Sequence, residues 1–160
     1  AQRYPNEVAG AILINSSVNS LSGLFQRIRP TALLKLVQGI REKDSLKREK
    51  ILLGFICNQR AQDADLAARF AAITQKRPVK RSAIFRQLAG AAFFKPNLGP
   101  IRVPVLVLAS LNDQMVNPNC SRAIAQQWGF PLKEHPSAGH DLPLDDPDWV
   151  LDQVRNWRTS

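Results

Sequence analysis

Asp113 and His140 have the residue types and the placement that acid–base chemistry requires. Asp113 lies in the segment SLNDQMVNP, and His140, one of two histidines in the chain, follows 27 residues later in SAGHDL. A carboxylate that accepts a hydrogen bond from one imidazole nitrogen fixes the tautomer of the ring and stabilises its protonated form. The other ring nitrogen is then able to act as a general base. The pair therefore predicts proton transfer at His140, with Asp113 as the orienting acid.

Other carboxylates compete for the same role. Asp141 is adjacent to His140 and is expected to point away from it, while Asp145, Asp146 and Asp148 have the spacing of helix-start residues. A histidine in a glycine-containing loop is also typical of a surface turn. The residues taken alone leave both a catalytic and a structural reading of the pair open.

Short apolar runs supply the elements that must position the pair. Residues 10–15 (GAILIN), 103–109 (VPVLVLA) and about 131–135 (PLKEH) are expected to be strands, the first two buried on both faces of a parallel sheet. The chain segments that carry Asp113 and His140 follow the second and third of these strands. Since neighbouring parallel strands deliver their C-terminal loops to one edge of a sheet, we expect the two side chains to meet there.

Helical periodicity fills most of the remaining chain. Prolines at 30, 78, 96 and 100 interrupt the long stretch between the first two strands. Asn117-Pro118 and Asp146-Pro147 each put a capping side chain before a proline at a first helical position. The expected helices are 31–40, 44–58, 61–75 and 80–93 before the second strand, one that starts at Pro118 and runs through 123–128, and one that starts at Pro147 and runs through 149–157.

Composition excludes several classes of protein. The 160 residues are 44% hydrophobic and 22% charged, which is typical of a globular chain. No apolar run approaches the roughly 20 residues of a membrane span, and the N-terminus does not have the pattern of a secretory signal. Cys57 and Cys120 form no CxxC motif and lie near no other metal ligands. We therefore expect two reduced thiols, a cytoplasmic protein, and neither a metal nor a cofactor.

The net charge of +9 belongs to one part of the chain. Residues 25–102 hold 17 Lys and Arg against 5 Asp and Glu, whereas the rest of the chain is slightly acidic. The charges in this part alternate with apolar residues at helical spacing, without interleaved aromatics and without a nucleic-acid-binding motif. We expect a solvated helical face. A surface that binds an acidic protein, a membrane or nucleic acid is the alternative, and of these partners nucleic acid is not expected.

Several segments together resemble the α/β-hydrolase fold, and in particular bacterial esterase-like members. LASLNDQMV and SAGHDLPLDDPDWV are similar to its acid and histidine segments, and the YP-x-x-V turn of AQRYPNEVAGAILINSS is similar to the turn that leads into its sixth strand. QKRPVKRSAIFRQLAGAAFF adds to the likeness. The resemblance implies the last three parallel strands of that fold with flanking helices. Residues 1–18 and 99–160 would form the core, and residues 19–98 a four-helix cap.

The same resemblance implies a catalytic serine on a G-x-S-x-G turn, and this motif is absent from the chain. The serine is then expected upstream of Ala1. Ser16 and Ser17 follow the first strand and are the alternative nucleophiles, but Asn15 and Asn19 stand where a strained elbow favours glycine.

The sequence therefore predicts carboxylic-ester hydrolysis by a Ser-His-Asp triad, with the 160 residues inactive by themselves. The substrate class is a small ester or acyl group, which an acidic carrier protein could present to the basic cap. A strand at residues 10–15 without its neighbour predicts pairing with an N-terminal half or self-association. The alternative function is a non-catalytic module whose basic helices bind an acidic partner.

Overall fold

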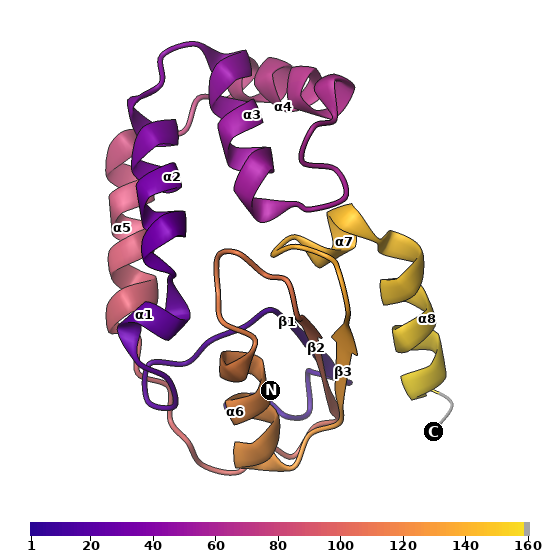
Figure 1. The fold of residues 1–160 in the computed structure, drawn as a ribbon. Coiled ribbons are helices and arrows are strands. Elements are labelled where there is room, and N and C mark those ends of the chain that lie inside the picture. The colour runs from indigo at the N-terminus through magenta and orange to yellow at the C-terminus, as the bar shows by residue number, and fades with distance from the viewer. Residues whose placement is uncertain (159–160) are drawn as a thin grey trace.

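A three-stranded parallel sheet with the order β1-β2-β3 lies between helices in the computed structural model, which describes residues 1–158 (Figure 1). The strands are β1 (Ala11–Ile14), β2 (Val105–Ser110) and β3 (Leu132–His135). The helices are α1 (Leu24–Arg27), α2 (Pro30–Arg41), α3 (Ser45–Ile56), α4 (Ala64–Lys76), α5 (Arg81–Phe93), α6 (Asn119–Trp128), α7 (Leu142–Asp145) and α8 (Pro147–Arg158). The expected parallel sheet and the six expected helices are confirmed. The four-residue helices α1 and α7 were not predicted.

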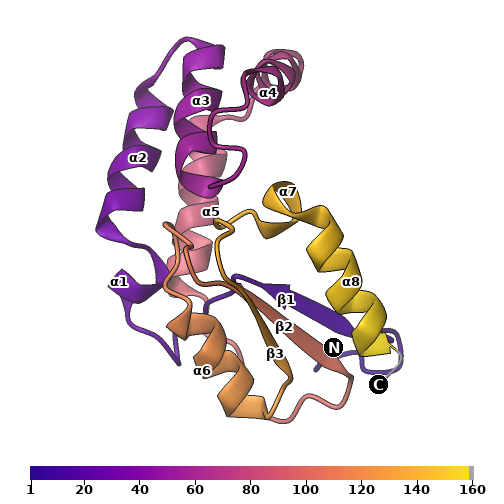
Figure 2. The same cartoon turned by 45° about the vertical axis from the view of Figure 1, so that its right-hand side comes forward.

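The central strand β2 is buried along its whole length, as a strand that is apolar on both sides requires. Its alternate side chains enter two different cores. Leu106 and Leu108 pack with residues of α7 and α8, whereas Val107 packs with Ile124 and Ala125 of α6. The sheet is therefore the middle layer of three, with α6 on one face and α8 on the other (Figure 2).

Capping residues define the start of α8 and the end of α6, the two helices that flank the sheet. Asp146 precedes α8, and its carboxylate accepts a hydrogen bond from the Trp149 N–H at 3.0 Å. Gly129 ends α6 in the left-handed conformation, with φ of 68°. These caps fix where the chain leaves α6 for β3 and where it enters α8.

Helices α1 to α5 form a separate group beside the ends of the strands (Figures 1 and 2). Side-chain carboxylates of Asp44 and Asp63 cap α3 and α4 by accepting the N–H groups of Lys47 and Leu66. Leu53 and Leu66 belong to one buried cluster that Leu144 of α7 also contacts. The end of α3 is thereby packed against the region that carries His140.

Strand β1 pairs with β2 alone in the described sheet, and its residues are less buried than those of β2. Ile12 retains 38% of its side-chain exposure. No helix within residues 1–158 combines the length and the apolar character needed to cross a membrane.

Candidate functional site

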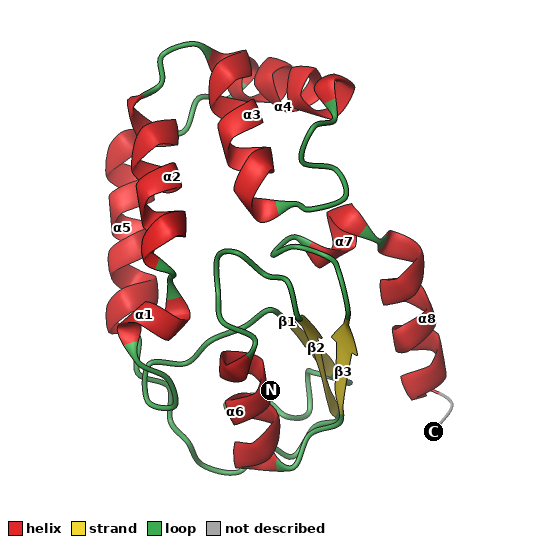
Figure 3. Cartoon of the chain, in the orientation of Figure 1, coloured by secondary structure: helices red, strands yellow, loops and turns green. Residues whose placement is uncertain are grey.

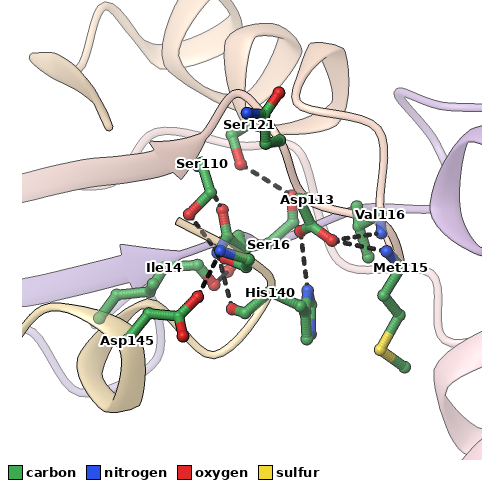
Figure 4. Close-up of polar contacts among 12 residues, drawn as sticks. Ile14, Ser16, Ser110, Asp113, Met115, Val116, Ser121, His140 and Asp145 are labelled. Carbon is green, nitrogen blue, oxygen red and sulfur yellow. Dashed lines mark hydrogen bonds and ion pairs between the residues drawn. The ribbon is translucent and has the colours of Figure 1, made fainter. Parts of the chain in front are cut away.

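Asp113 and His140 meet at the edge of the sheet where β2 and β3 end. The loops after these two strands leave the sheet on the side where α3 terminates (Figure 3). Asp113 Oδ2 lies 2.8 Å from His140 Nδ1 (Figure 4). The sheet register accounts for this juxtaposition, because Ser110 at the end of β2 pairs with His135 at the end of β3.

The Asp113 carboxylate is held by its own loop. Its second oxygen, Oδ1, accepts the N–H groups of Met115 at 2.7 Å and Val116 at 2.9 Å, and 1% of the side chain is exposed. An ionised carboxylate only accepts hydrogen bonds, so Nδ1 of His140 is the donor. The tautomer with a free lone pair on Nε2 follows.

His140 differs from Asp113 in being accessible. Its side chain is 28% exposed, and Nε2 has no hydrogen-bond partner among residues 1–158. A histidine that is oriented at Nδ1 and open at Nε2 can take a proton from a group placed beside it.

Asn15, the residue after β1, links the end of β2 to the loop that carries His140. It has φ of 45°, the only positive φ outside glycine in the described chain. Its amide Nδ2 donates to Ser110 Oγ at 3.1 Å and to the His140 carbonyl at 2.7 Å, and its Oδ1 accepts the Ser110 N–H at 2.7 Å. Asparagine tolerates the left-handed region better than most residues, because its short side chain bonds locally. The backbone carbonyl of His140 is thus fixed from the first strand.

The residues on either side of His140 are fixed from the helical group. The Asp141 N–H donates to the Ile56 carbonyl at 2.8 Å. Gly139 lies so close to the end of α3 that a Cβ built there would be 2.7 Å from the same Ile56 oxygen. Only a residue without a side chain fits this contact.

Asp145 is not the helix-start residue that the sequence indicated. It ends α7, is 6% exposed, and directs its carboxylate back toward α3. Its Oδ2 accepts the N–H groups of Gly139 at 2.7 Å and Asn58 at 2.8 Å, and its Oδ1 accepts those of Gln59 and Arg60, each at 3.1 Å. We call these four hydrogen bonds the Asp145 clamp. The prediction failed because three of the four amides in the clamp lie more than 80 residues earlier in the chain.

The second histidine, His135, forms a His–Asp pair that sequence reasoning missed. Its Nδ1 accepts the N–H groups of Ser137 and Ala138, so Nε2 carries the proton and donates to Asp146 Oδ2 at 3.1 Å. Only 5% of the side chain is exposed. Both ring nitrogens are occupied, and His135 has a structural role. A histidine at the C-terminal end of a strand was the only signal for it in the sequence.

Ser16, the first of the two serines after β1, bonds to neighbouring groups at the end of the strand. Ser16 Oγ donates to the Ile14 carbonyl at 3.1 Å, and its own carbonyl accepts from Ser121 Oγ at 3.3 Å. Ser16 therefore caps the end of the strand. No hydrogen bond within the described residues joins Ser16 or Ser17 to His140.

The thiols lie in the interior. Burial raises the pKa of the Cys57 thiol to about 12, and the nearby Asp145 and Asp141 carboxylates add to the rise. Cys120 is also buried, and burial raises the pKa of its thiol. Within residues 1–158, no three His, Cys, Asp or Glu side chains gather as metal ligands would.

Comparison with known proteins bears on the whole of this arrangement. The family model described as "Alpha/beta hydrolase family" matches residues 1–153, which is nearly the entire chain. The chain belongs to the alpha/beta hydrolase family. No curated protein matched the sequence significantly.

Solved structures of alpha/beta hydrolases agree with the fold at low sequence identity. The enol-lactonase from Burkholderia xenovorans aligns with a TM-score of 0.73 and 17% identity over 100% of this chain and 60% of its own. The malate-bound esterase from Thermogutta terrifontis aligns with a TM-score of 0.66 and 19% identity over 99% of this chain and 58% of its own. The esterase RhEst1 from Rhodococcus aligns with a TM-score of 0.65 and 16% identity over 96% of this chain and 56% of its own. The chain thus spans a little over half the length of these structures. The likeness establishes the fold and leaves the reaction to be argued from the site.

Proposed function

We propose that this chain contributes the acid and the histidine of a Ser-His-Asp triad that hydrolyses carboxylic esters. The observation that carries the proposal is the 2.8 Å contact between Asp113 Oδ2 and His140 Nδ1, with Nε2 of His140 open. The nucleophile is a serine that precedes residue 1 in a longer protein. Membership of the alpha/beta hydrolase family supports this arrangement.

The proposed reaction has two acyl-transfer steps. The serine Oγ attacks the ester carbonyl while Nε2 of His140 takes the hydroxyl proton, and the same nitrogen then gives that proton to the departing alcohol. In the second step water attacks the acyl-enzyme carbonyl while Nε2 takes a proton from it. The bond to the serine Oγ then breaks, Nε2 returns the proton to that oxygen, and the acid is released. Asp113 keeps Nδ1 protonated throughout and stabilises the imidazolium, because its two oxygens are already aligned by Met115, Val116 and His140.

The proposal also divides the chain by role. Residues 1–18 and 99–160 are the catalytic core, and residues 19–98 form a cap that covers the bound ester. Backbone contacts of the helical group to Gly139 and Asp141 support a cap that touches the histidine loop. The exposed edge of β1 is available for a further strand, either from a preceding part of the same protein or from a second copy.

The decisive test is His140→Ala in the full-length protein, with a short 4-nitrophenyl ester as substrate. Loss of the general base should lower kcat by a factor of about a thousand or more. His135→Gln is the matched control: it should lower stability but leave kcat per folded molecule within about twofold, because neither nitrogen of His135 is free. A His140→Ala protein with the rate of the wild type would overturn the proposal.

A second function remains as a candidate because of the charge in residues 25–102. In that case the basic helices bind an acidic partner, such as an acyl carrier protein, and the chain performs no catalysis. Full-length protein that is not labelled by a fluorophosphonate probe, yet binds an acidic carrier in a salt-sensitive manner, would favour this function. Labelling at Ser16 or Ser17 would instead make one of them the nucleophile.

A further inference from the structure

A polar pocket lies where the helical group meets the loop that carries Asp113. Its volume is about 470 Å³, and four separate segments line it. They are Arg29 before α2, Asn58 after α3, and the loop residues Leu111–Gln114 with Ser137. The pocket is large enough for a small organic molecule.

Asn58, Gln114 and Asp113 in this pocket already have hydrogen-bond partners, and Asn112 and Ser137 are exposed to solvent. Asn58 Nδ2 donates to the carbonyls of Asn112 and Ser137, each at 3.0 Å, and Asn58 Oδ1 accepts from Gln114 Nε2 at 2.9 Å. The Asp113 carboxylate is occupied by His140 and by two N–H groups of its own loop. These groups need no ligand to complete their hydrogen bonding.

Arg29 is the exception. Its Nε is buried and has no acceptor, and its guanidinium makes no ion pair or hydrogen bond within residues 1–158. Arg27 is different: its Nε is also unpartnered, but its two terminal nitrogens donate to the carbonyls of Ala91 and Ala92. A buried donor without an acceptor is costly, so an unpaired guanidinium facing a pocket indicates an acceptor that arrives from outside.

The backbone of Arg29 is bonded to the loop that carries Asp113. The Arg29 N–H donates to the Met115 carbonyl at 2.9 Å, and the Met115 N–H in turn bonds Asp113 Oδ1. Arg29 is therefore tied to the turn that orients the acid. A group bound by this side chain would share a pocket with Asp113, the acid of the proposed enzyme.

We propose that Arg29 binds the acid group of an anionic ligand, a carboxylate or a phosphate, in this pocket. The planar guanidinium matches such groups with two parallel hydrogen bonds, and Asp113 does not oppose them because its charge is already compensated by His140 and by two N–H groups. The inference rests on the proposed function in one respect: if the anion is part of the substrate, the esters hydrolysed are ones with an acid group at a distance from the scissile bond.

The test compares two esters of equal chain length in the full-length protein. 4-Nitrophenyl hydrogen glutarate carries a free carboxylate, and 4-nitrophenyl pentanoate does not. Arg29→Met should lower kcat/KM for the glutarate at least about tenfold, the value of one or two charge-assisted hydrogen bonds, and that for the pentanoate less than about twofold. Arg29→Lys, which retains the charge without the fork, should lie between. Arg41→Met, at the far end of α2, removes the same charge and should change neither rate.

Adding glutarate or inorganic phosphate distinguishes an anion that binds separately from an acid group that is part of the substrate. If the acid group belongs to a free effector, these anions should alter the pentanoate rate of the wild type and have no effect on that of Arg29→Met. Calorimetric binding of both anions supplies a readout that does not depend on catalysis, so an inactive protein that still binds them through Arg29 would refute the proposed function alone. Equal losses for both esters, together with anion binding that survives Arg29→Met, would refute the anion site alone.

Discussion

Removal of the Asp145 carboxylate should destabilise the protein substantially. The two N–H groups on Oδ2, from Gly139 and Asn58, lie at the packed junction between the histidine loop and α3, and they would lose a charged acceptor. The two on Oδ1 come from Gln59, which is exposed, and Arg60, and water can replace their acceptor. With about 1.5 to 2 kcal/mol for each bond to a charged group that is not replaced, Asp145→Ala should cost about 3 to 4 kcal/mol.

Urea unfolding followed by tryptophan fluorescence measures this cost. For a slope of about 2 kcal/mol per M, the midpoint of Asp145→Ala should fall by about 1.5 to 2 M. Asp152→Ala is the matched control, since its carboxylate is 65% exposed and its pair with Arg155 is worth little. Asp145→Asn keeps the shape and one acceptor oxygen, so about half of the loss is expected. Amide exchange should accelerate at residues 58–60 and 139.

A midpoint for Asp145→Ala within about 0.5 M of the wild type would refute the reasoning, because it would mean that water or a local shift replaces all four acceptors. The reasoning would also be refuted if Asp152→Ala lowered the urea midpoint as much as Asp145→Ala does. In that case general loss of negative charge, rather than the clamp, would account for the stability.

Three further outcomes are expected. Gly139→Ala should destabilise the protein by about 1 to 3 kcal/mol, because the added methyl meets the Ile56 carbonyl, and under the proposed function it should also lower the rate of ester hydrolysis; wild-type unfolding would contradict the close contact. The thiol of Cys57, with a pKa raised by burial, should resist alkylation at about pH 8 until the protein unfolds, as mass spectrometry of labelled protein would report. The Trp149 N–H and the neighbouring imidazole hold the pKa of Asp146 below its usual range, so its contribution to stability is complete above the usual carboxyl pKa and is lost as the pH falls through the lowered value. Asp146→Asn should therefore lose more stability at about pH 6 than at about pH 3 in urea titrations.

The sheet and the meeting of Asp113 with His140 could be predicted because both depend on local patterns. Residues 105–110 are apolar enough to be read as a buried strand. The loops that carry Asp113 and His140 follow β2 and β3, and these two strands are neighbours in a parallel sheet whose strand order follows the sequence. Helix α8 begins where the sequence shows Asp146-Pro147, a capping side chain before a proline at the first helical position. In each case a short stretch of residues contains the whole signal.

The supports of the site could not be predicted, because they depend on contacts between distant segments. Asp145 stands before an Asp-Pro dipeptide and looks like a helix start, yet three of its four partners lie 85 to 87 residues earlier. Asn15 bonds groups 95 and 125 residues away. Arg29 is one of seventeen basic residues between 25 and 102, and only the three-dimensional arrangement distinguishes it from those that face solvent.

The insertion of five helices between β1 and β2 has a consequence for the order of folding. Ninety residues separate these paired strands, whereas 21 separate β2 from β3. Closing the longer loop costs only about 1.2 kcal/mol more in chain entropy, since that cost rises by about 0.6 kcal/mol for each doubling of length. Rates respond more strongly than stability to such separations. We therefore expect β2, α6 and β3 to assemble first and β1 to dock late, carrying Asn15 with it, so that His140 acquires its final backbone position in one of the last steps of folding.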